Sequence, residues 1–431
     1  MGTKTAGFIK YSDNPLNFTT TDNRGVLSEA LSFRNIIQDV CDLNEYHFID
    51  LNESFKRFLE DSSKKISQAE TYNDNINLSV LFVLNGPTLN KETSSKAIQF
   101  FKNTFGRASV IYYIQIDPAL YLDVNNYPNI IRKNNVHIIG NTGIKAALTK
   151  TNKCFTEPGL LKYYSFFNKY IQRLSHEGHV CKFYSDDNSS SKYYEFPLSC
   201  YRFNKCVSQL SVNVVPDPDE QTDLIYIGGS RNGMRDAIIE KYCCPTQSKN
   251  KNFKVALCGS FPDILGKFDT NEQIIFYKPV KFNEVPSYIR ENSKSTVLIG
   301  DPIYSKLNII APRYIEALES GRICFISEEM MSEDFKDELN YILKKKTCYS
   351  DNEINEFLKY IQVSNISDIE QKIDHLFNTD SNDNVVNARI LKFKDRIINC
   401  QNVILNYLMT AQLNVLYSGF QHLITIATYE L

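Results

Sequence analysis

The sequence Asp-Leu-Ile-Tyr-Ile-Gly-Gly-Ser-Arg-Asn-Gly-Met-Arg occupies residues 223–235 and is the strongest indication of fold in the chain. Residues 223–227 form a short apolar run rich in β-branched and aromatic side chains, which is typical of a buried parallel strand. A glycine-rich turn, residues 228–233, follows, and residues 236–242 have a helical pattern. A strand, a glycine-rich turn and a helix in this order direct free backbone N–H groups toward an anion.

Two arginines four residues apart, Arg231 and Arg235, lie beside this turn. Guanidinium groups match the oxygens of a phosphate, so the segment is a candidate site for a phosphate-bearing ligand. The alternative is an ordinary strand-to-helix connection with solvated arginines, and the motif alone leaves both interpretations open.

A second segment of the same kind begins with residues 296–300, which are expected to form a buried strand that ends at Asp301. Pro312 suits the first position of a helix, and Gly321 suits the position after its end. We therefore expect a short helix between these two residues, with the next strand at residues 322–326.

Arg313 and Glu316 lie three residues apart in the first turn of that predicted helix, on one face and at its positive end. A cation and a carboxylate placed in this way can bind a nucleotide diphosphate together. The arginine takes the phosphate charge, and the glutamate accepts hydrogen bonds from the ribose hydroxyls. The simpler interpretation, an ion pair within the helix, stays open.

Four motifs in this half of the chain occur in the order of a known family: residues 223–235, Leu-Cys-Gly-Ser at 257–260, Leu-Ile-Gly-Asp at 298–301 and Arg-Tyr-Ile-Glu at 313–316. Together they resemble the donor half of the DNA β-glucosyltransferases of T-even bacteriophages, over residues 223–334. The resemblance implies an α/β chain of GT-B architecture. Two Rossmann-like domains would face each other across a central cleft, and a C-terminal helix would cross back to the first domain.

The family transfers glucose from UDP-glucose to 5-hydroxymethylcytosine in double-stranded viral DNA, which protects the DNA from host nucleases. By resemblance, the arginines would offset charge on the leaving diphosphate, Glu316 would hold the ribose, and the glycines would let the backbone approach the donor. Mg²⁺ or Mn²⁺ would assist release of the diphosphate, through unknown ligands. The nucleotide-sugar-binding residues implied in this way are Gly228, Gly229, Ser230, Arg231, Arg235, Gly259, Lys281, Asn283, Asp301, Arg313 and Glu316.

Asp117 is the candidate catalytic base. It directly follows the predicted strand 109–116, and ligands bind at the carboxyl ends of strands in a parallel sheet. A carboxylate at this place can take the proton of a hydroxymethyl group. Tyr112-Tyr113 with Asp117 also resembles the family segment that carries the base. Because Pro118 follows, the alternative is an aspartate that starts a turn.

Two further positions correspond to glutamates of the family. Glu29 is a candidate for contact with the sugar, although its spacing from the loop at residues 16–19 differs from the family pattern. Ser199 stands where the family has a second glutamate. This departure leaves open a different sugar or a different modified base.

At 431 residues and 49.6 kDa, the chain is long enough for two domains with separate cores. Its formal net charge of −2 argues against a strongly basic nucleic-acid binder, so any DNA surface would be a local basic patch. Each of the candidate patches can also be a solvated surface. They are Arg132-Lys133, residues 150–153 and residues 344–346.

The eleven cysteines include no CxxC pair, and we expect free thiols in a reducing cytoplasm. No apolar signal core is present, and no run approaches the ~18 apolar residues of a membrane span. We therefore expect a monomer in the cytoplasm, that of the host if the protein is viral. His176, His179 and Cys181 lack a fourth ligand and are expected to form a surface turn.

The N-terminal half alternates predicted strands with helical patterns, which predicts a parallel sheet. The acidic, proline-containing segment 214–220 is the expected linker between domains. The predicted domains are an acceptor (DNA) domain at residues 1–213, a donor domain at 214–385, and one or more C-terminal helices at 386–431 that brace the first domain.

These observations favour an inverting glycosyltransferase that moves a sugar, in the first place glucose, from a UDP-sugar to hydroxymethylated DNA. Two alternatives stay open. The first is a UDP-sugar-dependent transferase acting on hydroxymethyluracil DNA, a small molecule or a glycan, which the near-neutral charge favours. The second is a nucleotide-sugar-binding protein without catalytic activity.

Overall fold

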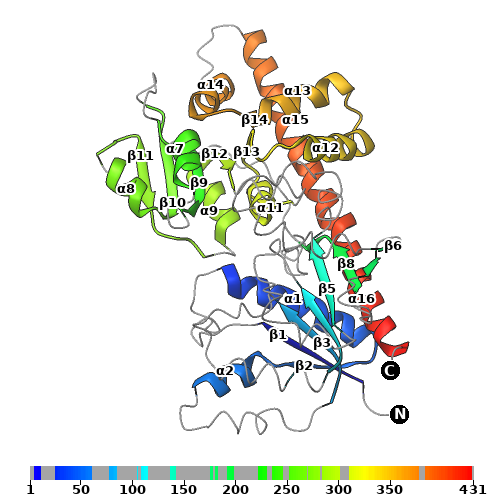
Figure 1. Ribbon diagram of the computed structural model, residues 1–431. Helices are drawn as coiled ribbons and strands as arrows, with labels where there is room; N and C mark the ends of the chain where they lie inside the picture. The colour runs from blue at the N-terminus through cyan, green and yellow to red at the C-terminus, as the bar shows by residue number, and fades with distance from the viewer. Residues whose placement is uncertain are drawn as a thin grey trace. The chain divides into compact units, whose positions relative to one another are not determined.

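In the computed structural model, the chain divides into two compact units, which we call unit 1 (Met1–Cys206 with Gln412–Leu431) and unit 2 (Val207–Ala411) (Figure 1). The structure describes residues 4–10, 25–60, 77–84, 104, 108–114, 136–141, 175–177, 180–182, 192–198, 222–230, 235–245, 252–268, 270–281, 284–300, 310–377 and 384–429.

Unit 1 is built on an eight-stranded sheet in the order β2-β1-β3-β4-β5-β8-β7-β6. The strands from β2 to β8 run parallel to their neighbours, and β7 and β6 continue the sheet antiparallel at one edge. The inner strands are apolar runs with almost every residue buried, as parallel sheets covered on both faces require. The strands are β1 (Thr5–Lys10), β2 (His47–Asp50), β3 (Leu78–Leu84), β4 (Ala108–Ile114), β5 (Val136–Asn141), β6 (Ser175–Glu177), β7 (Val180–Lys182) and β8 (Lys192–Phe196).

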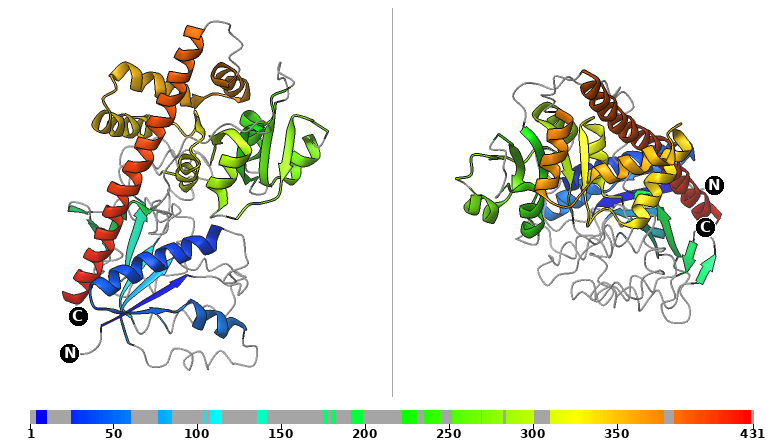
Figure 2. Two further views of the ribbon diagram at one scale, coloured as in Figure 1. Left: turned by 180° about the vertical axis from the view of Figure 1, so that it is seen from behind. Right: turned by 90° about the horizontal axis from the view of Figure 1, so that it is seen from above.

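The last helix of the chain completes the core of unit 1. α16 (Leu413–Tyr429) packs against α1 (Gly25–Leu43) and against β3 and β8, and the two helices lie side by side (Figure 2). The ring of Phe420 in α16 meets the rings of Phe33 and Phe82 edge to face, at centroid distances of 6.3 and 5.7 Å. A shorter helix, α2 (Asn52–Glu60), follows β2.

Unit 2 contains a six-stranded sheet in the order β11-β10-β9-β12-β13-β14, with all neighbours parallel. This is the order of a doubly wound nucleotide-binding sheet, in which the first strand lies next to the point where the strand order reverses. The α/β class with two parallel sheets predicted from the sequence is confirmed. The strands are β9 (Thr222–Gly229), β10 (Val255–Ser260), β11 (Ile274–Tyr277), β12 (Ser293–Leu298), β13 (Ile323–Ser327) and β14 (Gln362–Val363).

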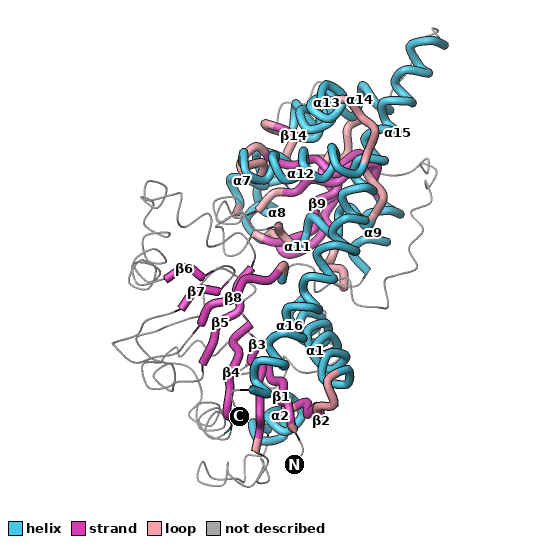
Figure 3. The backbone as a smooth tube through the Cα atoms, turned by 90° about the vertical axis from the view of Figure 1, so that its right-hand side faces the viewer, coloured by secondary structure: helices cyan, strands magenta, loops and turns pink. Residues whose placement is uncertain are grey.

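The short helix expected between Pro312 and Gly321 is confirmed, because Pro312 opens it and Gly321, at φ 71°, follows its C-cap. Residues Glu333–Lys346 and Asp351–Ile361 also form helices (Figure 3). None of the described helices is both long and apolar enough to span a membrane. The helices of unit 2 are α7 (Asp236–Cys243), α8 (Pro262–Phe268), α9 (Val285–Asn292), α11 (Pro312–Glu319), α12 (Glu333–Lys346), α13 (Asp351–Ile361), α14 (Ile366–Phe377) and α15 (Asn384–Tyr407).

The long C-terminal helical pattern is interrupted at the boundary between the units. α15 ends at Tyr407, a π-helical segment covers Leu408–Gln412, and α16 begins at Leu413. Within this segment the hydroxyl of Thr410 donates to the backbone oxygen of Asn406 over 2.7 Å. Side-chain bonding of this kind inside a helix accompanies local changes of helical geometry.

The side chain of Gln401 in α15 hydrogen-bonds to the backbone edge of β13, as a neighbouring strand would. β14 has only two residues, which pair with Ile326 and Ser327 at the end of β13. The buried Gln401 side chain bonds to the part of β13 that precedes these two residues. It accepts from the backbone N–H of Cys324 and donates to the backbone oxygen of Arg322, each over 2.9 Å.

Replacing Gln401 by leucine is therefore expected to lower the free energy of unfolding by about 2–4 kcal/mol, because two buried backbone groups lose their partners. Urea denaturation followed by circular dichroism measures the effect. Gln421→Leu makes the same change on an exposed position of α16 and is expected to alter stability by less than ~0.5 kcal/mol. Equal effects of the two substitutions would contradict the role of Gln401.

Candidate functional site

The glycine-rich turn after β9 requires its glycines for close packing against β10. Gly228 pairs with Gly259 and Gly229 pairs with Ser260 in the strand register. Gly259 has φ +148°, and a Cβ atom there would lie 1.7 Å from the backbone oxygen of Gly228. The two strand ends can approach this closely only because Gly259 lacks a side chain.

Ser230 closes the turn by backbone hydrogen bonds. Its N–H donates to the oxygen of Ser260 over 3.1 Å, and its oxygen accepts from the N–H of Arg235 over 3.0 Å. Arg235 is the N-cap of α7 and makes no side-chain capping bond. The first N–H groups of α7 therefore form the anion-attracting end of this segment.

Tyr226 lies near two of the three arginines that the sequence assigned to the site, Arg235 and Arg313. Its side chain is 2% exposed, and burial raises the pKa of its hydroxyl, while the nearby guanidinium groups of Arg235 and Arg313 act in the opposite direction. Arg235 also lies within hydrogen-bonding reach of this hydroxyl. Three elements, β9, α7 and α11, thus place two cations around one buried tyrosine.

Gly228 makes room for this arrangement, since a Cβ atom there would lie 2.4 Å from the hydroxyl oxygen of Tyr226. Arg313 is also close to Cys258 of β10: burial raises the pKa of that thiol, and Arg313 is among the groups that oppose the rise. The guanidinium of Arg313 therefore lies near the carboxyl ends of both β9 and β10.

Arg313 and Glu316 form an ion pair within the first turn of α11. The Glu316 side chain is 1% exposed, whereas that of Arg313 is 35% exposed. The ion-pair interpretation that the sequence left open is thus present in the structure. A buried carboxylate that pairs with a half-exposed guanidinium fixes the direction in which the cation is presented.

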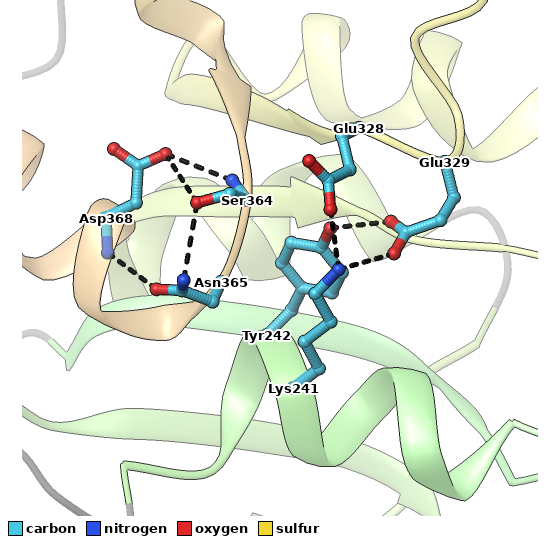
Figure 4. A network of polar contacts seen from close by, with 7 residues as sticks. All are labelled: Lys241, Tyr242, Glu328, Glu329, Ser364, Asn365 and Asp368. Atoms are coloured by element: carbon cyan, nitrogen blue, oxygen red, sulfur yellow. Dashed lines mark hydrogen bonds and ion pairs between the residues drawn. The ribbon is translucent and has the colours of Figure 1, made fainter.

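α7 is tied to the residues that follow β13 by a polar network at the end opposite to Arg235 (Figure 4). The amino group of Lys241 lies 2.7 Å from a carboxylate oxygen of Glu328 and 2.7 Å from one of Glu329. The hydroxyl of Tyr242 donates to Glu329 over 2.5 Å. Although burial acts to raise it, these hydrogen bonds lower the pKa of Glu329. The network ties the C-terminal end of α7 to the residues that follow β13.

Lys281 lies beyond β11 and forms an exposed ion pair with Glu284, with 3.6 Å between the charged atoms. Glu29 belongs to α1, where only its backbone is described. Of the basic patches, residues 344–346 form the last turn of α12; Lys344 pairs with Asp351 and Lys345 donates to Tyr341, as on a solvated surface. The other predicted positions lie outside the described residues: Asp117, Arg132-Lys133, residues 150–153, His179, Ser199, Arg231, Asn283 and Asp301.

The sequence did not identify Tyr226, Lys241, Tyr242 or Glu329 as contributors to the site. Tyr226 occupies an ordinary position in an apolar strand, and the available signal was a hydroxyl two residues before Gly228. The partners of Lys241 come from residues 87 and 88 positions further along the chain, a distance over which no local pattern carries information.

Replacing Gly259 by alanine is expected to lower the free energy of unfolding by about 2–4 kcal/mol, because the new Cβ meets a backbone oxygen at a positive φ. The midpoint of guanidinium denaturation measures this. Gly266→Ala in α8 is the matched control, since nothing lies within 4 Å of its Cβ position, and it is expected to stabilise by ~0.5–1 kcal/mol. If Gly259→Ala unfolded like Gly266→Ala, the close approach of β9 and β10 would be disproved.

No protein-family description matches this chain, and no curated protein matches its sequence. Solved structures of T4 phage β-glucosyltransferase are similar to it in three dimensions. One of these structures comes from work on the enzyme's substrate binding and proposed catalytic mechanism. It is 14% identical in sequence to this chain, with a TM-score of 0.54. A second, the T4 phage enzyme in complex with its UDP-glucose substrate, is 15% identical with a TM-score of 0.54. A third, the DNA-modifying enzyme β-glucosyltransferase in the presence and absence of uridine diphosphoglucose, is 14% identical with a TM-score of 0.52.

Each comparison covers 98% of this chain and 99% of the other. A likeness of this extent at such low identity establishes the fold, so the chain has the GT-B fold of glycosyltransferases. The GT-B prediction from the sequence is confirmed.

Proposed function

We propose that the protein is an inverting glycosyltransferase that moves glucose from UDP-glucose to the hydroxymethyl group of 5-hydroxymethylcytosine in double-stranded DNA. The observation that supports the proposal is that Arg235 and Arg313 both lie close enough to the buried Tyr226 to act on the pKa of its hydroxyl, at the end of β9 where Gly228 leaves room for that hydroxyl. Two guanidinium groups at the carboxyl end of β9 provide positive charge where a doubly wound sheet binds a nucleotide. The GT-B similarity to an enzyme with UDP-glucose supports the same ligand.

In the proposed reaction, Asp117 takes the proton of the hydroxymethyl group while its oxygen attacks the anomeric carbon of the sugar. The bond between that carbon and the diphosphate oxygen breaks, and UDP leaves with the bonding electrons. Arg235 and Arg313, together with Arg231, stabilise the charge that develops on the diphosphate. Glu316 holds Arg313 and, in the proposal, also accepts from the ribose, and Lys281 and Asn283 flank the base.

Among the described residues, no group of three or more His, Cys, Asp or Glu side chains is arranged to hold a metal ion. In the proposal, the arginines stabilise the charge on the leaving diphosphate. Mg²⁺ or Mn²⁺ is expected to add to the rate of UDP release, which EDTA tests in the transfer assay.

Mass spectrometry of nucleosides tests the proposal directly. Hydroxymethylcytosine DNA and unmodified DNA are incubated with the protein and a panel of UDP-sugars. A hexose mass on the modified DNA alone is the expected result. No added mass with any sugar would refute the proposed acceptor.

A transferase for another acceptor is the second candidate, because the net charge of −2 is unusual for a protein that binds the DNA backbone. The same assay distinguishes this candidate from transfer to hydroxymethylcytosine DNA when the acceptor is hydroxymethyluracil DNA, a small molecule or a glycan. A nucleotide-sugar-binding protein without activity would bind UDP in calorimetry and neither transfer nor hydrolyse any sugar.

A further inference from the structure

A cavity of about 740 Å³ lies in unit 2 and shares no lining residue with the proposed donor site. α13, α14 and α15 surround it, together with residues that follow β13 and β14. Its volume falls within the range of pockets that bind small molecules.

Cations converge on this cavity from three helices. Lys359 comes from α13, Lys372 from α14, and Arg389 and Arg396 from α15. Burial lowers the pKa of Lys372 although Asp368 lies beside it, and the charge of Lys359 contributes in the same direction. Positive groups close enough to repel each other in a partly buried space would be stabilised by a bound anion.

The acidic side chains of the lining are already paired. Asp368 accepts from the N–H of Ser364 over 3.0 Å (Figure 4). It also pairs with Lys372. Glu356 pairs with Arg396, and Glu328 pairs with Lys241 outside the cavity.

Two exposed cations of the lining, Lys359 and Arg389, have no acidic partner among the described residues. Neither Lys359 nor Arg389 forms an ion pair with another residue of the described segments. The charge that the cavity offers to a ligand is therefore positive.

One wall of the cavity is aromatic and apolar. The ring of Phe393 meets that of Tyr360 edge to face at a centroid distance of 4.9 Å, and Val363 and Ile390 extend this wall. The hydroxyl of Tyr360 donates to the backbone oxygen of Lys372 over 2.6 Å, which fixes its ring. Two of the cations lie against these rings: the amino group of Lys372 is 5.7 Å from the centroid of Tyr360, and the guanidinium carbon of Arg396 is 5.0 Å from that of Phe393. Cations beside rigid aromatic rings suit a ligand with a phosphate and a flat, weakly polar body.

We propose that this cavity is a second ligand site that binds a mononucleotide, with Lys359 and Arg389 at its phosphate and Tyr360 and Phe393 at its base. The site is separate from the proposed donor site and does not depend on it. A nucleotide bound between α13, α14 and α15 would tie these helices together.

The chain contains no tryptophan, so Phe393→Trp introduces a single fluorescent reporter into the wall of the cavity. Adenosine 5′-monophosphate is expected to change its emission saturably, and adenosine, which lacks the phosphate, is expected to bind at least ~10-fold more weakly. Inorganic phosphate tests whether the cavity binds free phosphate rather than the phosphate of a nucleotide. A nucleotide site binds it at least ~10-fold more weakly as well, and equal affinities for phosphate and nucleotide would overturn the assignment.

Charge-reversed variants test whether the fluorescence change comes from nucleotide bound in this cavity. In the reporter background, Arg389→Glu and Lys359→Glu are each expected to weaken nucleotide binding by ~10-fold or more. Lys346→Glu, the same change on an exposed lysine outside the cavity, is expected to leave it unchanged, as is Arg313→Ala in the donor site. Ile390→Trp supplies a second reporter in case Phe393→Trp disturbs packing. Unchanged emission of both reporters, or full affinity in both charge-reversed variants, would refute the site.

Discussion

Replacing Arg313 by alanine is expected to lower kcat/KM for sugar transfer by ~10²-fold or more, because the leaving diphosphate loses a charge partner at the transition state. Its guanidinium lies near the ends of β9 and β10, and Glu316 fixes its direction. Steady-state kinetics with UDP-glucose and hydroxymethylcytosine DNA measure the effect.

Loss of Arg313 also leaves the buried Glu316 without its ion-pair partner, so thermal unfolding must be compared at the assay temperature. Lys336→Ala in α12 is the control, since it removes an exposed i,i+3 pair with Glu333 and is expected to leave both rate and stability unchanged. A folded Arg313→Ala variant with the rate of the wild type would remove Arg313 from the donor site.

Asp117→Asn is expected to reduce kcat by ~10²–10⁴-fold while the Kd for UDP stays unchanged, because an amide cannot take the proton of the attacking hydroxyl. Single-turnover transfer measures the chemical step, and calorimetry measures UDP binding. Asp337→Asn makes the same chemical change on an exposed position of α12. If transfer persisted at the wild-type rate, another group would have to be the base. Weakened UDP binding would instead indicate a role for Asp117 on the donor side.

Local sequence signals predicted the elements of unit 2 well. Pro312 and Gly321 delimited α11 because each has a conformational preference that acts within one turn. The apolar run before Gly228 predicted β9 for the same kind of reason, since burial on both faces favours a continuous hydrophobic strand.

Features that depend on packing between distant segments could not be predicted in this way. Gln401 was an unremarked polar residue in a helical pattern, yet it bonds to two backbone groups of the β13 edge. β14 is too short to leave a periodic signal. The cavity between α13, α14 and α15 likewise arises only from the way these helices pack. For the site, the sequence supplied Arg235 and Arg313, and only the structure revealed that both lie near the buried Tyr226.

The position of α16 has a consequence for synthesis on the ribosome. Unit 2 is one continuous segment, Val207–Ala411, whereas unit 1 needs Gln412–Leu431 in addition to the first half of the chain. Phe420 packs on Phe33 and Phe82, so the core of unit 1 stays incomplete until α16 has emerged. Domains usually fold in the order of their synthesis. In this protein we expect the order to be reversed, with unit 2 reaching its native packing before α16 is available to complete the core of unit 1.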